Sequence, residues 1–150
     1  MLSHKAKYAL KALFRLASAP PGTMMLVAEI AEQENAPKKF LELILLELKR
    51  NGLVYSIRGR NGGYGLAQPA AHITLGQVIR LMDGPLAPLP CASLSGYRRC
   101  IDCTNEEACQ VRIVMREVRD AVAKILDSRT LVDVGIGDAA RFLNQVGVDI

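Results

Sequence analysis

Hydrophobic positions in the first fifty residues repeat at the three- and four-residue spacing of helices. This pattern predicts a helix over residues 3–18, with Ser3 as its N-cap, and two further helices over 27–33 and 37–50. The turn between the last two is short, and Asn35 tolerates the left-handed backbone that such a turn needs. Two helices joined in this way have the outline of a helix-turn-helix.

The third predicted helix has an apolar face and a polar face. The apolar residues expected in the core are Phe40, Leu41, Ile44, Leu45 and Leu48. The outward face then carries Lys38, Lys39, Glu42 and Lys49. A recognition helix contacts base edges through residues near its start, so Lys38, Lys39 and Glu42 are candidate DNA-binding residues.

After this helix the pattern changes to alternation. Residues 53–58 and 64–66 alternate as β-strands do, and Asn61-Gly62 between them is a strong hairpin signal. We therefore expect a β-wing directly after the helix-turn-helix. Its glycines allow close approach to a phosphate backbone or a narrow minor groove, where arginine is favoured. The candidate DNA-binding residues of this wing are Arg58, Arg60, Asn61 and Gly62. A glycine-rich surface hairpin without a ligand is the alternative.

The second half of the chain is also predicted to be helical. Thr74 begins a capping box and a helix that ends near residue 84, and an extended proline-containing segment follows. Thr104 begins another capping box and a long helix to about Ser128, and residues 130–145 form a short final helix. Apolar residues on the long helix recur at heptad-like spacing: Val111, Val114, Val118, Ala121 or Val122, and Ile125. This stripe indicates a dimerisation helix, and packing against the winged part is the alternative.

The predicted fold class is mainly α: a winged helix-turn-helix with a two-stranded β-wing plus a long C-terminal dimerisation helix. The predicted parts are a DNA-binding domain over residues 1–84, a cysteine loop over 85–103, and the dimerisation helix with a C-terminal helix over 104–150. The 150 residues are 50% hydrophobic and 23% charged, which suits a globular chain and excludes disorder. Without a long apolar run or a signal-peptide hydrophobic region, we expect a cytoplasmic protein that makes no membrane contact.

The positive charge lies in the N-terminal half. Residues 1–70 hold ten Lys and Arg against five Asp and Glu, a net charge of +5, whereas residues 71–150 hold nine against ten, a net charge of −1. A basic half on a small domain suggests a polyanionic partner, usually nucleic acid. A solvated basic face without a partner is the alternative.

All four cysteines lie within 19 residues: Cys91, Cys100, Cys103 and Cys109. In a cytoplasmic protein such a cluster more often binds metal or senses redox state than forms structural disulfides. Arg98, Arg99 and the start of the long helix favour thiolates. Soft thiolates select zinc or iron–sulfur clusters, and the spacing does not choose between them. A dithiol redox pair and chance clustering of structural cysteines are the remaining alternatives.

Several of these motifs together resemble the Rrf-two family of bacterial winged-helix transcription regulators, which includes the IscR- and NsrR-type iron–sulfur sensors. The resemblance covers about residues 2–130 in the family's order, and its most specific part is the wing motif. The matching segments are Lys7-Tyr8-Ala9, Ala28-Glu29-Ile30-Ala31, Asn51-Gly52-Leu53-Val54 through Arg58-Gly59-Arg60-Asn61-Gly62-Gly63-Tyr64, Ile73-Thr74-Leu75-Gly76-Gln77-Val78-Ile79, and the three-cysteine region.

This resemblance implies a homodimer that binds double-stranded palindromic promoter DNA. It assigns base reading to Glu42 and a minor-groove contact to Arg58. It also implies an iron–sulfur cluster, 2Fe-2S or 4Fe-4S, held by Cys91, Cys103 and Cys109.

Two departures concern the fourth cluster ligand. IscR-type members have a histidine three residues after the last cysteine, where this chain has Arg112. NsrR-type members have an acidic residue on the partner's first helix, where this chain has Tyr8. Cys100 is an additional cysteine in the same loop, and we therefore expect it to be the fourth ligand. The alternative is that Cys100 is a spare thiol, or that His4 or a small molecule completes the site.

The predicted function is that of a transcription regulator, not an enzyme, whose promoter affinity depends on an iron–sulfur cluster. One alternative is the same DNA-binding fold with structural zinc or no metal, controlled by thiol redox or by a protein partner. A dithiol redox enzyme using Cys100 and Cys103 is less favoured, because no thioredoxin-like pattern surrounds this pair.

Overall fold

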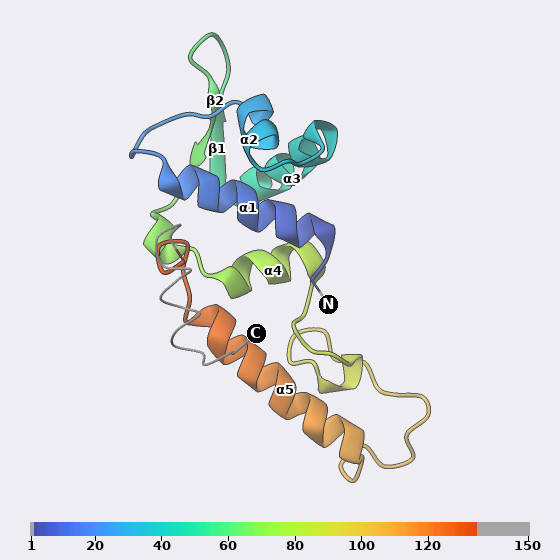
Figure 1. Cartoon of the computed structure of the whole chain (residues 1–150). Coiled ribbons are helices and arrows are strands. Elements are labelled where there is room, and N and C mark those ends of the chain that lie inside the picture. Colours follow the sequence, from blue (N-terminus) through green and yellow to red (C-terminus); the bar gives the residue numbers. More distant parts are fainter. Residues whose placement is uncertain (1, 135–150) are drawn as a thin grey trace.

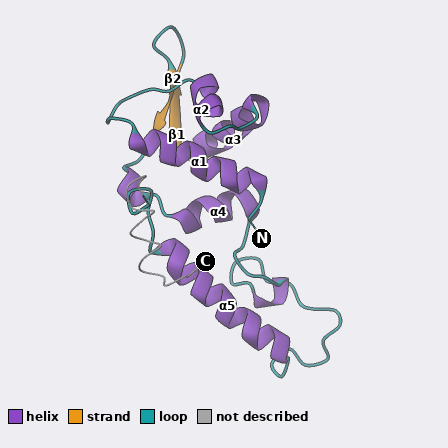
Figure 2. Ribbon diagram, viewed as in Figure 1, coloured by secondary structure: helices purple, strands orange, loops and turns teal. Residues whose placement is uncertain are grey.

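The computed structural model describes residues 2–134 and is mainly helical, with one two-stranded antiparallel sheet (Figure 2). This confirms the predicted fold class. The helices and strands, in chain order, are α1 (His4–Ser18), α2 (Val27–Gln33), α3 (Lys38–Arg50), β1 (Val54–Ile57), β2 (Gly63–Leu66), the 3-10 helix η1 (Ala70–His72), α4 (Leu75–Asp83), the 3-10 helix η2 (Pro90–Ala92) and α5 (Gln110–Asp127).

Local signals explain where the first three helices begin and end. The Ser3 hydroxyl accepts a hydrogen bond from the Ala6 backbone N–H at 3.0 Å, which caps α1 as predicted. Asn35 has a φ of 49° in the turn between α2 and α3, and Gly52 has a φ of 71° directly after α3. Pro37 is the N-cap of α3 and not its first helical residue, so this boundary prediction was one residue early.

One hydrophobic core holds together the winged part, which consists of α1 to α4 and the β1–β2 hairpin. It combines the inner faces of α1, α3 and α4 with the start of the hairpin, and α1 lies against both α3 and α4. The largest fully buried side chains are Leu13, Ile30, Leu41, Ile44, Leu45, Leu48, Leu53, Ile73, Val54 and Val78. Each contributes roughly 1.5–3 kcal/mol by leaving water.

The hairpin is the predicted wing, but its turn is wider than the Asn-Gly signal suggested. Ile57 pairs with Gly63, so residues 58–62 form a five-residue loop. Gly62 donates its N–H to the Gly59 carbonyl at 3.0 Å, and any side chain at this position would overlap the Ile57 carbonyl. Gly62 is therefore required for the shape of the turn.

The long helix begins later than predicted. α5 starts at Gln110 with Cys109 as its N-cap, so the capping box assigned to Thr104 was wrong, as was the position of Cys109 in the second turn. The reason is local: the Asn105 side chain accepts hydrogen bonds from the backbone N–H groups of Glu107 and Ala108 and closes a separate turn. Most of the predicted helix over 130–145 lies outside the described residues.

α5 contacts the winged part at its C-terminal end and extends away from it toward its N-terminal end (Figure 1). Arg80 on α4 forms a bidentate ion pair with Asp127, with nitrogen–oxygen distances of 2.6 and 2.8 Å. The chain then returns to the winged part, where the Leu131 N–H donates to the Ile73 carbonyl and the Leu131 side chain joins the core. Within residues 2–134, no helix combines the length and the hydrophobicity that crossing a membrane requires.

Gly76 makes this attachment possible, because a Cβ there would overlap the Asp127 carboxylate and lie 2.9 Å from Arg80 Nη1. In a helix, alanine is otherwise favoured over glycine by roughly 0.5–1 kcal/mol. We therefore expect Gly76→Ala to give no gain in the free energy of unfolding in the wild-type background. In an Asp127→Ala background, where the obstructing carboxylate is gone, the same change is expected to gain about 0.5 kcal/mol. Urea unfolding of the four proteins measures both values, and equal gains in the two backgrounds would contradict this account.

Candidate DNA-binding surface and cysteine cluster

The candidate DNA-binding residues gather at one end of the molecule. α2, α3 and the hairpin occupy the same end, opposite the cysteine loop (Figure 1). All of these candidates are exposed except Gly62, which is buried in the turn: Lys38, Lys39, Glu42, Arg58, Arg60 and Asn61. Their placement is compatible with one DNA duplex contacting α3 and the wing, although their individual contacts remain predictions.

Ion pairing elsewhere concentrates the free positive charge at this end. Lys5 lies 2.7 Å from Glu47, and Lys11 and Arg15 lie 3.3 and 2.6 Å from Glu34. Within residues 2–70, the remaining cations form no ion pair, and all but the first belong to α3 or the wing: Lys7, Lys38, Lys39, Lys49, Arg50, Arg58 and Arg60. The positive charge found in the N-terminal half of the sequence is thus concentrated on α3 and the wing.

Lys49 also fixes the wing relative to α3. Its ammonium donates a hydrogen bond to the Ser56 hydroxyl on β1 at 2.6 Å. On its other edge, β2 is held by a bridge between Met25 and Tyr64, whose backbone groups exchange hydrogen bonds of 2.8 and 3.0 Å. The wing is therefore attached on both sides, which orients its tip relative to α3.

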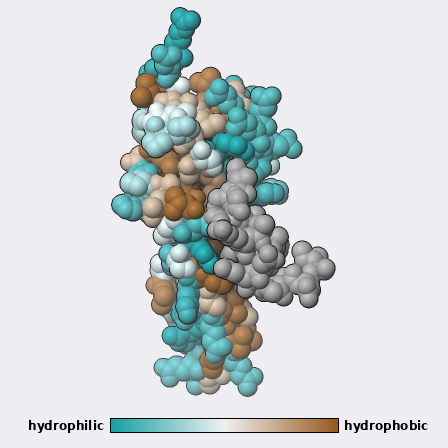
Figure 3. All heavy atoms as spheres, turned by 60° about the vertical axis from the view of Figure 1, so that its left-hand side comes forward, coloured by the Kyte–Doolittle hydropathy of each residue, from teal (hydrophilic) through white to brown (hydrophobic). Residues whose placement is uncertain are grey.

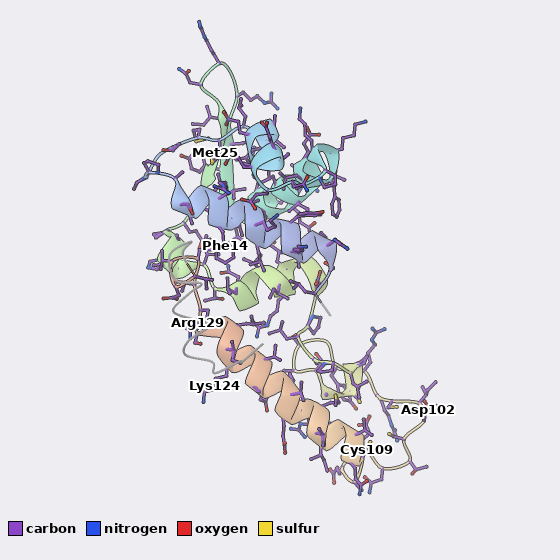
Figure 4. All side chains as sticks on the ribbon, in the orientation of Figure 1. Phe14, Met25, Asp102, Cys109, Lys124 and Arg129 are labelled. Carbon is purple, nitrogen blue, oxygen red and sulfur yellow. The ribbon has the colours of Figure 1, made fainter. Side chains whose placement is uncertain are left out.

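Three of the four cysteines lie together at the far end of α5, where Figure 4 labels Cys109. Contact with the Cys109 thiol, and to a lesser extent with that of Cys100, raises the pKa of Cys103 to about 12. The backbone N–H of Arg112, together with the Cys103 thiol, lowers the pKa of Cys109. Because thiolates are the metal-binding and nucleophilic form of cysteine, Cys109 is better prepared as a ligand than Cys103.

Cys91 lies apart from these three, in the 3-10 helix η2. Its side chain is 7% exposed, and it shares a hollow of about 390 Å³ with Cys100. Arg98 and Arg99 line the same hollow and supply positive charge. The sequence thus grouped four cysteines, whereas the structure brings three into contact and places the fourth across this hollow.

Two arginines on α5 hold the loop that carries Cys91. Arg112 Nε donates to the Cys91 carbonyl at 2.9 Å, and Arg119 Nη1 donates to the Ala92 carbonyl. Arg119 is buried, and its charge is balanced by Asp120 at 2.6 Å. Sequence reasoning missed both roles, although two arginines two turns apart share one face of a helix.

A second set of contacts holds the other side of the loop. The Glu106 carboxylate accepts hydrogen bonds from the Tyr97 hydroxyl at 2.6 Å and from the Cys100 N–H at 3.2 Å. The Tyr97 hydroxyl lowers the pKa of Glu106. Arg112 also donates to the Glu106 carbonyl at 3.3 Å. Arg112, at the position of the IscR-type histidine ligand, therefore joins both sides of the loop.

The donor types fit an iron–sulfur cluster or zinc, because thiolates are the preferred ligands of both. The arrangement is not preformed, however: across residues 2–134, no group of three or more His, Cys, Asp or Glu side chains is placed to hold a metal ion. A bound metal centre would therefore require the loop to adjust, above all to bring Cys91 to the other three.

The apolar stripe of α5 is not covered by the winged part. The exposed members of the predicted stripe are Val111, Val114, Val118 and Ile125. Hydrophobic surface is visible on the lower part of the molecule, which α5 and the preceding loop form (Figure 3). Packing against the winged part of the same chain, the alternative considered above, is found only near the end of α5, where Val122 shares a hollow with Leu2 and Ile79; it does not cover the four exposed residues.

Comparison with known proteins agrees with this architecture. The model of the Rrf2 family, described as an iron-dependent transcriptional regulator, matches residues 2–135. The chain is 44% identical over 137 residues to an rrf2-like HTH-type transcriptional regulator named in Rhodobacter capsulatus, a match covering 89% of this chain and 91% of that protein. It is 34% identical over 148 residues to an HTH-type transcriptional regulator named in Mycobacterium tuberculosis, covering 99% and 89% of the two chains.

Two solved structures are similar over nearly the whole chain. CymR, the global cysteine regulator of B. subtilis, has a TM-score of 0.73 and 32% identity, covering 89% of this chain and 94% of that one. IscR of T. potens has a TM-score of 0.70 and 25% identity, covering 100% and 93%. These proteins are transcription regulators, not enzymes. The chain therefore belongs to the Rrf2 family of winged-helix, DNA-binding transcriptional regulators.

Proposed function

We propose that this regulator is a homodimer that binds palindromic promoter DNA with an affinity set by a cysteine-ligated iron–sulfur cluster. Cys100, Cys103 and Cys109 would hold the cluster together with Cys91. The observation that carries this proposal is the contact of the Cys103 thiol with both Cys100 and Cys109, next to the first backbone amides of α5. The match to the iron-dependent family and the similarity to IscR support it.

The dimer is proposed because Val111, Val114, Val118 and Ile125 of α5 are exposed and have no apolar cover among residues 2–134. Heptad-like spacing suits packing against a second helix, and burial of the stripe would stabilise the pair by roughly 25 cal/mol for each Å² removed from water. Two recognition helices related by a two-fold axis would then read two half-sites about one helical turn apart.

A path of direct contacts supports coupling between the cysteines and DNA. A bound cluster would supply a large, redox-sensitive local charge. Movement of the loop would act on α5 through Arg112 and Arg119, which bind its carbonyls. α5 is in turn fastened to α4 by the Arg80–Asp127 ion pair, and α4 packs against α1 in the winged core. A change at the cysteines would thus alter the relative position of the two winged parts.

At the DNA, the exposed residues divide by chemistry. Glu42 is an acceptor suited to the cytosine amino group in the major groove. Arg58, on the wing, would enter the minor groove, whereas Lys38, Lys39 and Arg60 would neutralise phosphates.

A cluster-free thiol switch is the second candidate, because Cys103 contacts two other thiols and one similar protein, CymR, is named a global cysteine regulator. Structural zinc, or control by a protein partner, would use the same DNA-binding surface. Metal and sulfide analysis distinguishes these alternatives from an iron–sulfur cluster.

Cluster control predicts different DNA affinities for the loaded and the metal-free protein. In anaerobic gel shifts on its own promoter, we expect the two forms to differ at least about tenfold, which corresponds to a coupling of about 1.4 kcal/mol. Cys103→Ala removes the thiol that contacts both Cys100 and Cys109. This variant should bind DNA like the metal-free wild type, whether or not iron and sulfide have been supplied. Equal affinity of loaded and metal-free wild type would rule out cluster control, and a colourless protein that responds only to oxidants would favour the thiol switch.

The wing predicts two distinguishable arginine variants. Arg58→Ala is expected to lose more affinity for sites with A/T-rich steps at the wing than for G/C-rich ones, because a narrow minor groove attracts arginine. Arg60→Ala serves as the matched control: it should weaken all sequences alike and reduce the salt dependence of binding by about one ion. Randomised-site selection followed by salt titration measures both effects. If Arg58→Ala retained the wild-type sequence preference, a minor-groove role would be refuted.

A further inference from the structure

Helix α3 carries two stripes at the same helical spacing, one on each side. Its buried stripe packs in the core and consists of Leu41, Ile44, Leu45 and Leu48. The opposite stripe, shifted by two residues, consists of Lys39, Glu42, Leu43 and Leu46. This outer stripe is exposed over its whole length, and half of it is hydrophobic.

Leu43 is the prominent member of the outer stripe. Its side chain is 65% exposed, whereas that of Leu46 is 38% exposed. Glu42 and Lys39 lie next to it, and Lys39 has no ion-pair partner among the described residues. Whatever covers this face must therefore offer negative charge to the lysine and an apolar group to the leucine.

A DNA major groove offers both. Phosphates line its edges, and the thymine C5-methyl is the apolar group that the base pairs present there. A recognition helix contacts bases through its N-terminal part, and Leu43 lies in the first half of α3, one turn after Lys39. A protein surface is disfavoured as the cover, because the unpaired cations of α3 and the wing flank the same face.

We propose that Leu43 contacts a thymine methyl group and so specifies a thymine in each half-site. This inference rests on α3 being the recognition helix of the proposed function, and it is independent of cluster control. Leu43 would thus contribute to DNA sequence specificity through an apolar contact, in addition to the charged residues of α3.

The experiment removes the methyl group from the DNA. Duplexes bound by the full-length protein are first selected from a randomised pool, and the thymines of each half-site are then replaced one at a time by deoxyuridine, which lacks only the C5-methyl. We expect one position per half-site at which wild-type affinity falls about fourfold, the factor that corresponds to burying one methyl-sized group. Leu43→Ala should bind the thymine and uracil duplexes equally.

Two matched variants make the test specific. Leu46→Ala, on the same stripe but farther from the helix start, should keep the full methyl preference. Lys39→Ala should weaken both duplexes by the same factor. The inference is overturned if no uracil substitution changes wild-type affinity more than twofold, or if Leu43→Ala retains the preference for thymine. A pool that yields no bound duplex would instead refute the DNA-binding role of α3 itself.

Discussion

The attachment of the cysteine loop to α5 by two arginines is the interaction on which the rest of the proposed mechanism depends. Only the η2 part of the loop is buried, whereas Leu94 is 80% exposed and Ile101 is 97% exposed. Its position is instead set by Arg112 and Arg119, which donate to the carbonyls of η2. Hydrogen bonds from charged donors are stronger than neutral ones, so these two arginines fix η2 while the exposed part of the loop is held by few apolar contacts. Such a segment is suited to adjusting when a metal centre binds.

Cations have different roles inside the winged part and on its proposed DNA-binding surface. In the winged core, Lys5, Lys11 and Arg15 are paired with glutamates and hold helices together. On α3 and the wing, the cations are left without ion pairs and remain available to phosphates. The net charge of the N-terminal half therefore understates how strongly the free positive charge is concentrated at the proposed DNA-binding surface.

Much of the fold follows from local patterns, because capping and periodicity are properties of neighbouring residues. Ser3 and Thr74 cap the helices they were expected to cap. The prediction fails where two local signals compete, as at Thr104, where the Asn105 side chain binds the amides that a longer helix would have used. The loop contacts of Arg112 could not be predicted, because they join side chains to carbonyls of a segment far along the chain.

The grouping of the cysteines shows the same limit. Spacing places all four in one region, yet only the folded chain shows that Cys103 contacts Cys100 and Cys109 while Cys91 lies in a separate 3-10 helix. The family resemblance implied a ligand set of Cys91, Cys103 and Cys109, and the structure adds Cys100 to the cysteines in contact.

Native mass spectrometry of the anaerobically isolated full-length protein tests this account most directly, because one spectrum reports both subunit number and bound inorganic atoms. The account predicts the mass of two chains plus iron and sulfide. A single-chain mass, or a two-chain mass with zinc or with no added atoms, would contradict it.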